Sequence, residues 1–221
     1  MQVGIVGGTG PLGQGLALRL ADAGVDVVVG GRDGARSADV VGALVAQWPE
    51  RSLAISGADN ATAADADVVV VATPWDALAA TVRPLAARLQ GKVVVSVANA
   101  LVKDGRELHA VVPPRSSMAG VVQAAAPGAL VAAACQHLPA ADLADLSGDL
   151  QADVLVCSDH AEATATTMEL LGKIGGLRPL DAGSLGSAGP IEAFTAVLVT
   201  LNIRYRAHAT LRLGGIEPTP R

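Results

Sequence analysis

The chain has 221 residues, long enough to bury a substantial core in one large domain or in one domain with a smaller lobe. Its formal net charge is −5 and no run of basic residues stands out, which argues against general nucleic-acid binding. Hydrophobic residues make up 51% of the sequence but aromatic residues only 2%, so we expect a core of alanine, valine and leucine.

The first 24 residues carry the most informative pattern. A short apolar stretch at residues 3–6 predicts a buried strand, and an amphipathic helix is predicted to end near Gly24. Between them, Gly8, Gly10 and Gly13 have the G-x-G-x-x-G spacing of a dinucleotide-binding turn. Such glycines allow a tight bend and bring the backbone close to a pyrophosphate, which faces the free N–H groups of the helix. The alternative is a glycine-rich loop that binds no ligand.

The predicted second strand, at residues 27–29, ends in Gly30-Gly31-Arg32. Enzymes that prefer NAD usually place an acidic residue here, whereas an arginine suits the 2′-phosphate of NADP. Arg36 adds a second positive charge one helical turn later, and Asp33 would partly offset the attraction. We therefore predict NADP rather than NAD. The alternative is that both arginines are solvated charges of a loop.

Strand and helix patterns alternate through the first two-thirds of the chain. Helices are predicted at 35–48 and 76–89, and strands near 53–55 and at 68–72, 92–97 and 130–135, with a polar turn at 57–60. The fully apolar strand at 68–72 is typical of a parallel sheet that is covered on both faces, and Thr73-Pro74-Trp75 follows it. This rhythm predicts an α/β fold of the Rossmann type, a doubly wound parallel sheet with right-handed crossovers.

The pattern changes beyond Pro139. A strand is predicted at 153–157, a helix at 162–174, an extended piece at 178–181, and a long apolar helix from about Ile191 to Leu213. We expect an NADP-binding domain at 1–140 and a small C-terminal α/β lobe at 141–221 that ends in the long helix. Residues 217–221 are expected to form a frayed tail.

Neither a targeting signal nor a membrane span is predicted. The first strand begins at once, and Asp, Pro and Gly interrupt every apolar run before it reaches membrane-spanning length. Cys135 and Cys157 are predicted to be buried thiols rather than a disulfide or metal site, and the histidines lack metal-ligand spacing. We expect a soluble, cytoplasmic protein with no metal ion and with neither nucleic acid nor a membrane as partner.

Several segments are more particular than the glycine turn: Leu138-Pro139-Ala140-Ala141, the string Gly-Leu-Arg-Pro-Leu-Asp-Ala-Gly at 176–183, and Glu192 ahead of Leu201-Asn202. With residues 7–20, Val29-Gly30-Gly31-Arg32 and Pro74-Trp75, they make the sequence similar to the NADPH:F420 oxidoreductases, also called F420-dependent NADP reductases. The resemblance covers nearly the whole chain.

This resemblance implies reversible hydride transfer between C4 of the nicotinamide of NADP(H) and C5 of the deazaflavin coenzyme F420, with the two rings stacked between the domains. The small domain would supply the deazaflavin and dimer contacts. The cofactor-binding residues implied or indicated by the motifs are Gly8, Thr9, Gly10, Pro11, Leu12 and Gly13 at the phosphates, Gly31, Arg32 and Arg36 at the 2′-phosphate, Thr73, Pro74, Trp75 and Ala79 beside the cofactor, Val97, Ala98 and Asn99 near the nicotinamide, and His137, Leu138, Ala140 and Leu211 toward the deazaflavin.

Hydride exchange between two bound cofactors requires positioning rather than a nucleophile or a metal ion. We therefore assign no catalytic residue. His137 is interpreted equally well as a histidine satisfied at a strand end. One alternative is an NADPH-dependent imine or carbonyl reductase with Glu192 as general acid, although this residue is better explained as a first-turn carboxylate of the long helix. A second alternative is a non-catalytic NADP-binding redox sensor. The apolar long helix favours a homodimer.

Overall fold

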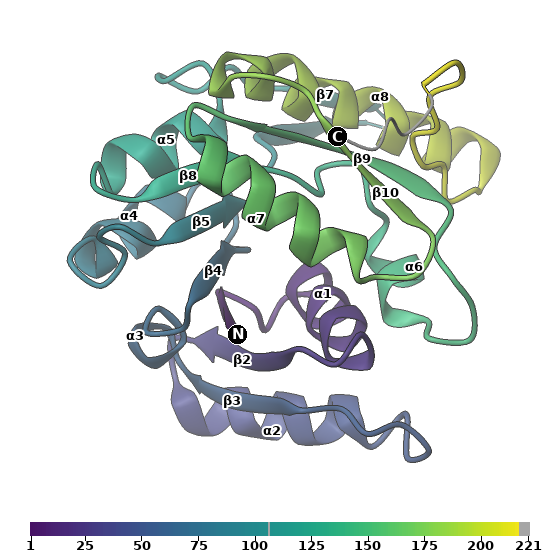
Figure 1. Ribbon diagram of the computed structural model, residues 1–221. Helices are drawn as coiled ribbons and strands as arrows, with labels where there is room; N and C mark the ends of the chain where they lie inside the picture. The colour runs from purple at the N-terminus through teal and green to yellow at the C-terminus, as the bar shows by residue number, and fades with distance from the viewer. Residues whose placement is uncertain (106, 217–221) are drawn as a thin grey trace.

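The computed structural model describes residues 1–105 and 107–216 (Figure 1). An eight-stranded sheet has the order β10-β9-β8-β5-β4-β1-β2-β3, and a separate hairpin pairs β6 with β7. Neighbours in the large sheet are parallel except β8 and β9. Its strands are β1 (Gln2–Val6), β2 (Asp26–Gly31), β3 (Ile55–Asp59), β4 (Val68–Val71), β5 (Val93–Ser96), β8 (Leu130–Ala133), β9 (Ala152–Ser158) and β10 (Leu177–Asp181). The hairpin consists of β6 (Leu101–Asp104) and β7 (Glu107–Ala110).

Helices cover both faces of the sheet, as expected for a doubly wound α/β fold (Figure 1). They are α1 (Pro11–Asp22), α2 (Gly34–Val45), α3 (Asn60–Ala63), α4 (Leu78–Val82), α5 (Met118–Ala125), α6 (Ala140–Ala144), α7 (Ala161–Gly172) and α8 (Ala188–Tyr205), with 3-10 turns at Arg83–Leu85 and Leu185–Ser187. Because β1 to β5 run parallel, their carboxyl ends lie at one edge of the sheet, where the loops build the site.

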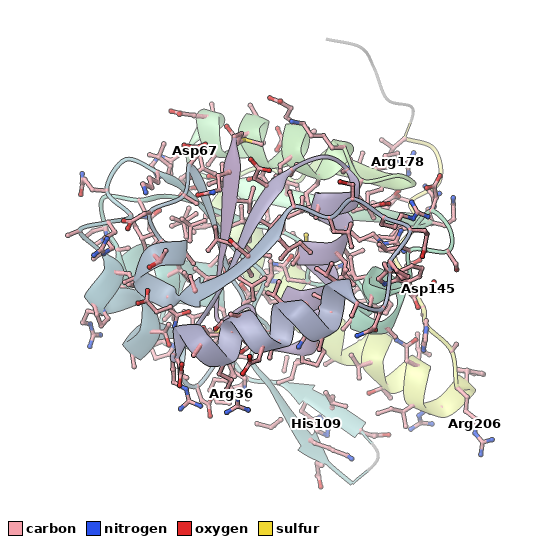
Figure 2. All side chains as sticks on the ribbon, turned by 90° about the horizontal axis from the view of Figure 1, so that it is seen from below. Arg36, Asp67, His109, Asp145, Arg178 and Arg206 are labelled. Carbon is pink, nitrogen blue, oxygen red and sulfur yellow. The ribbon has the colours of Figure 1, made fainter. Side chains whose placement is uncertain are left out.

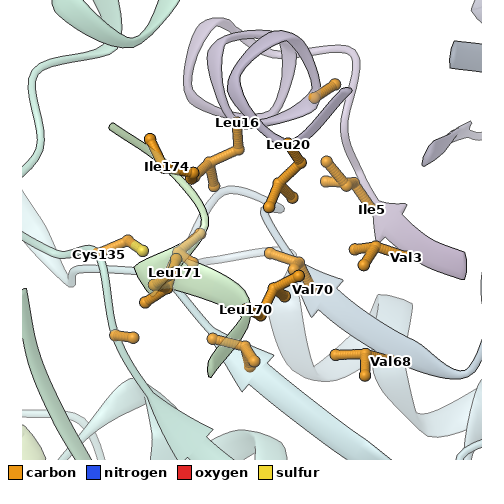
Figure 3. Packing of buried hydrophobic residues seen from close by; sticks show 14 of the residues in the cluster. Val3, Ile5, Leu16, Leu20, Val68, Val70, Cys135, Leu170, Leu171 and Ile174 are labelled. Carbon is orange, nitrogen blue, oxygen red and sulfur yellow. The ribbon is translucent and has the colours of Figure 1, made fainter. Parts of the chain in front are cut away.

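Successive side chains of a strand point to opposite faces of the sheet. The central strands are apolar throughout because helices cover both of these faces. Val68 and Val70 of β4 belong to the core under α1 and α7, whereas Val69 and Val71 belong to the core under α4 and α5. Figure 3 shows the first of these cores, in which Leu16 and Leu20 of α1 meet the sheet beside leucines of α7. The fully apolar run in β4 thus has the environment that its sequence predicts.

The long C-terminal helix is shorter than predicted. It ends at Tyr205 rather than near Leu213, because Arg206 takes a left-handed conformation with φ of 51° and the side chain of Asn202 accepts a hydrogen bond from the N–H of Ala209. The chain then runs beside β9, where the N–H of Asp153 donates to the carbonyl of Leu211 over 2.8 Å. The expected frayed tail, 217–221, lies outside the described residues.

Two other predictions differ from the structure. The helix expected at 76–89 stops at Val82 and continues as a 3-10 turn that contains Pro84, which has no N–H for an α-helical hydrogen bond. The polar turn expected at 57–60 is mostly strand, because β3 extends to Asp59 by pairing with β2. The hairpin β6-β7 and the helices α3, α5 and α6 were not predicted. The other predicted helices and strands are confirmed to within a few residues.

Helix α8 also corrects the expectation about apolar runs. Together with the preceding turn, the stretch Leu185–Tyr205 has 21 residues and is long and apolar enough to cross a membrane by length and composition alone. This is weak evidence for a span, since core helices of soluble proteins pass the same test. One face of α8 is buried, and it includes the carboxylate-bearing Glu192.

The sheet continues across the proposed domain boundary. Strand β9 lies beyond residue 140 and pairs antiparallel with β8, which lies before it. The C-terminal lobe, with β9, β10, α7 and α8, therefore extends the sheet of the first domain, and the division at residue 140 stays a prediction. Cys135 and Cys157 are free and buried, as predicted.

Candidate cofactor-binding site

A cleft of about 790 Å³ lies at the carboxyl ends of β1, β2, β4 and β5. This is where the strand order reverses direction in a doubly wound sheet, the usual place for a ligand. The residues that line it are Gly7, Thr9, Gly10, Pro11, Leu12, Gly31, Arg32, Asn60, Ala72, Thr73, Pro74, Trp75, Asp76, Ala77, Thr81, Val97, Ala98, Asn99 and Leu101.

The glycine turn has the geometry that its spacing predicts. Gly7 adopts a left-handed φ of 70°, and the N–H of Gly8 donates to the carbonyl of Gly30 over 2.8 Å, which joins the ends of β1 and β2. A Cβ on Gly13 would lie 2.5 Å from Cα of Gly8, so only glycine permits this packing. Around a Cβ on Gly10 there is no atom within 4 Å. The open side of Gly10 is the space that a pyrophosphate needs.

Helix α1 presents its N-terminus to this space. It begins at Pro11, whose fixed φ suits a first helical position, and no side chain caps it at Gly10. The first-turn N–H groups of a helix have no partner within the helix, and the helix dipole makes this end attractive to anions. Gly10, Pro11 and Leu12 line the cleft, so the predicted phosphate-binding residues are brought together.

The end of β2 supplies positive charge beside the turn. Arg32 lines the cleft and is exposed. The negative charge of Asp33 is engaged elsewhere: its carboxylate caps α2 by accepting hydrogen bonds from the N–H groups of Ala35 (2.9 Å) and Arg36 (3.2 Å). Arg36 is exposed on α2 and projects from the outer surface in Figure 2, and it does not line the cleft. The arrangement suits a phosphate on the adenosine side.

Thr73 provides a test of whether the cleft fits a dinucleotide. Its side chain lies at the wall of the cleft, only 9% exposed, and its hydroxyl has no hydrogen-bond partner among the described residues. An unpaired buried hydroxyl is costly, and a ribose or phosphate oxygen would satisfy it. Together with the open space at Gly10 and the helix N-terminus, this shows that the residues present fit the phosphate-bearing part of a dinucleotide.

The opposite end of the cleft, at the carboxyl end of β5, contains a fixed side-chain amide. Asn99 donates from Nδ2 to the carbonyl of Gln136 (3.2 Å), and its Oδ1 accepts from the hydroxyl of Thr195 on α8 (3.2 Å). The indole of Trp75 donates to the carbonyl of Leu101 over 3.2 Å, which holds the ring against the hairpin. Val97 and Ala98 complete this end of the cleft.

The residues predicted to contact the deazaflavin are not brought into the cleft. His137, Leu138, Ala140 and Leu211 do not line it. The ring of His137 is buried; its Nε2 lies 2.8 Å from the carbonyl of Ile191, to which it donates, and burial lowers its pKa. The structure thus shows the histidine satisfied at a strand end. Leu138 is part of the core, and the carbonyl of Ala140 packs against α1 at Gly15.

Glu192 is not the first-turn carboxylate of the long helix that the sequence predicted; instead it caps helix α5. It lies in the second turn of α8, and its two carboxylate oxygens accept from the N–H groups of Met118 (2.7 Å) and Ala119 (3.1 Å) at the start of α5. Burial raises the pKa of this carboxyl to about 7, although both hydrogen bonds oppose the shift. The residue does not line the cleft.

The sequence did not single out several residues of the cleft wall. These are Gly7, Asn60, Ala72, Asp76, Ala77, Thr81 and Leu101, whereas the predicted Ala79 lies outside the wall. For Asn60 a signal existed, because it follows a strand whose carboxyl end meets the same sheet edge as β1 and β2. Among the described residues, no group of three or more His, Cys, Asp or Glu could hold a metal ion.

The chain is similar to known proteins over nearly its whole length. The family model of NADP oxidoreductases dependent on coenzyme F420 matches residues 2–100. The F420-dependent NADP reductase of Methanocaldococcus jannaschii is 33% identical over 98% of this chain and 100% of its own length. That of Methanothermobacter marburgensis is 33% identical over 99% of this chain and 98% of its own. A solved structure from Arthrobacter sp. FB24, proposed to be an F420-dependent NADP reductase, has a TM-score of 0.79 at 26% identity and covers 94% of this chain and 96% of that one.

Proposed function

Because the chain belongs to the family of F420-dependent NADP reductases, we propose that its 790 Å³ cleft holds NADP(H) with the phosphates at the glycine turn and the nicotinamide at the end of β5. The protein is an oxidoreductase, and its reaction is hydride transfer between NADP(H) and coenzyme F420. The single observation that carries the placement is the open N-terminus of α1 beside Gly10, with Arg32 on the adenosine side.

Each part of the cleft has a task in binding. Backbone N–H groups of the glycine turn and α1 would hold the pyrophosphate, with Gly8 and Gly13 packed behind it to bring the backbone close. Arg32, with Arg36 nearby, would neutralise the 2′-phosphate. The unpaired hydroxyl of Thr73 would donate to a ribose or phosphate oxygen. These contacts anchor the nucleotide far from the reacting atoms.

At the other end, the chain orients the reacting rings. Trp75 and the segment Val97–Asn99 would form the wall against the nicotinamide, and Gln136 and Thr195 prevent the amide of Asn99 from rotating. With both coenzymes bound, a hydride passes between C4 of the nicotinamide and C5 of the deazaflavin. The protein would have to hold the two carbons at a reactive distance and keep water away from them. We place the deazaflavin next to the nicotinamide end of the cleft; contacts from His137, Leu138, Ala140 and Leu211, none of which lines the cleft, stay a prediction.

The surroundings of Glu192 argue against the reductase of a small imine or carbonyl. A general acid must reach its substrate, but this carboxylate is buried, faces the start of α5 and lies outside the cleft wall.

An absorbance assay with both coenzymes distinguishes the three candidate functions, which are the F420-dependent reductase, the small-substrate reductase and the redox sensor. Protein, NADPH and oxidised F420 should together bleach the visible absorbance of the deazaflavin. Turnover only after addition of imines or carbonyls would favour the small-substrate reductase, and tight NADPH binding without any turnover would favour a redox sensor.

We also propose that the protein is a cytoplasmic homodimer that associates through α8. This helix exposes Phe194, Val197, Leu201 and Tyr205, a row of large apolar or aromatic side chains at helical spacing. Their burial against a second copy would remove them from water. In analytical ultracentrifugation, Val197→Glu should sediment as a monomer, whereas Ala43→Glu, an exposed change on α2, should remain dimeric. A wild-type monomer at micromolar concentration would contradict the proposal.

A further inference from the structure

A side-chain amide enters the cleft from the end of β3. Asn60 is the first residue of α3, and Asp59 fixes its backbone by accepting a hydrogen bond from the N–H of Thr62 over 2.7 Å. Strand β3 pairs with β2, so this turn lies beside the end of β2, where Gly31 and Arg32 line the same cleft. None of the motifs in the sequence includes this residue.

The oxygen of this amide accepts a hydrogen bond from the glycine turn. Oδ1 of Asn60 accepts from the N–H of Gly7 over 2.9 Å, across 53 residues of sequence. Gly7 is the left-handed residue directly after β1, so the amide helps to hold the start of the turn in place. The same Oδ1 would lie 3.0 Å from a Cβ on Gly30, which shows how closely the amide fills the space between the ends of β1 and β2.

This hydrogen bond determines which way the amide group is turned. If the group were flipped, an NH₂ donor would face the N–H of Gly7, and both groups would lose their partner. Nδ2 therefore stays on the other side, with two N–H donors and no hydrogen-bond partner among residues 1–105 and 107–216. Asn60 is only partly buried and forms part of the cleft wall, so these donors remain available to a ligand.

We propose that Asn60 is a further nucleotide-binding residue, whose Nδ2 donates to an oxygen on the 2′-position of the adenosine ribose, a phosphate oxygen in NADP. The inference rests on the proposed placement of NADP in the cleft. Arg32 supplies charge there but is a flexible, exposed side chain, whereas the amide of Asn60 is held in place through Gly7. The arginine would supply positive charge, and the fixed N–H donor would determine where the phosphate oxygen binds.

Two substitutions separate binding from support of the turn. Asn60→Asp keeps an oxygen for the N–H of Gly7 and replaces the donor by a carboxylate oxygen that repels phosphate. Isothermal titration calorimetry should show its dissociation constant for NADP⁺ raised by about tenfold or more and that for NAD⁺ raised much less, with little change in melting temperature. Asn60→Ala should weaken both nucleotides and lower the melting temperature, because the turn also loses its acceptor.

Asn202→Asp is the matched control. Oδ1 of Asn202 likewise accepts a backbone hydrogen bond, from Ala209 over 2.6 Å, but the residue lies outside the cleft. This variant should bind NADP⁺ as the wild type does. If Asn60→Asp also binds NADP⁺ normally, the amide only supports the turn and the inference fails, while the proposed function stands. Equal losses for NADP⁺ and NAD⁺ would exclude the 2′-position. A wild-type protein that does not bind NADP⁺ would instead refute the placement of the nucleotide.

Discussion

The carboxylate of Glu192 on α8 accepts a hydrogen bond of 2.7 Å from the backbone N–H of Met118, the first residue of α5. With the bond from Ala119 it satisfies two N–H groups that a helix N-terminus leaves unpaired, and it ties α8 to α5. The carboxyl is only 4% exposed, and burial opposes its ionisation, whereas the two hydrogen bonds favour the charged form.

A pH dependence of stability follows from this burial. The pKa of Glu192 is raised from 4.5 to about 7, so the folded protein holds this proton more tightly than the unfolded chain does. Stability should therefore fall as the pH rises from about 4.5 through the folded-state pKa of about 7, by up to about 3 kcal/mol in total, and this group should add no further change above about pH 8. Urea unfolding across pH 5–8 should show that Glu192→Gln loses this slope, while the exposed Glu162→Gln keeps it.

Asp153 should have the opposite pH dependence. Its buried carboxylate accepts hydrogen bonds from Nε (2.8 Å) and Nη2 (2.6 Å) of Arg178 and from the N–H of Leu213. The contact with Arg178 lowers the pKa of Asp153 to about 2. Its contribution is present above pH 4 and is lost as the pH falls toward 2. Asp153→Asn should cost about 2–3 kcal/mol at pH 7, a cost moderated by the partial exposure of Arg178, and the two proteins should converge in acid.

The same variant should loosen the C-terminal segment, because Arg178 also donates to the carbonyls of Leu213 and Ile216. Hydrogen exchange of residues 211–216 measures this directly. In Figure 2, Arg178 lies on the side of the molecule remote from Arg36 of α2. If exchange in this segment stayed at the wild-type rate, the ion pair would not anchor it.

Arg32 should determine the preference for the phosphorylated nucleotide. In Arg32→Ala, kcat/KM for NADPH should fall by about tenfold to a hundredfold, because a charged hydrogen bond to the 2′-phosphate is lost, while kcat/KM for NADH changes little. Arg36→Ala, which alters a residue outside the cleft wall, should have a smaller effect. Equal losses for the two nucleotides would show that Arg32 does not recognise the phosphate.

The glycines of the turn should separate into two classes. Gly10→Ala places a Cβ in open space where the pyrophosphate is expected, so KM for NADPH should rise at least about tenfold with a loss of stability below about 1 kcal/mol. Gly13→Ala forces a Cβ to 2.5 Å from Cα of Gly8 and should cost about 1–3 kcal/mol in thermal unfolding. A Gly10→Ala variant with unchanged KM would move the pyrophosphate elsewhere.

Much of this protein follows from local patterns in the sequence. The alternation of strands and helices, the glycine turn and the exposed Arg32 each depend on residues within a few positions of one another, so spacing alone predicts them. The valines of β4 predict a sheet covered on both faces, since only such a strand needs apolar side chains in both directions.

Tertiary structure decided the features whose partners lie far apart in the chain. Asn60 meets Gly7 across 53 residues, Glu192 meets Met118 across 74, and Leu213 meets Asp153 across 60. A single polar residue in a sequence does not reveal which distant N–H it will satisfy, because folding selects the partner when it buries both groups together. For the same reason the sequence predicts that Glu192 complements the dipole of its own helix, whereas in the structure it caps α5.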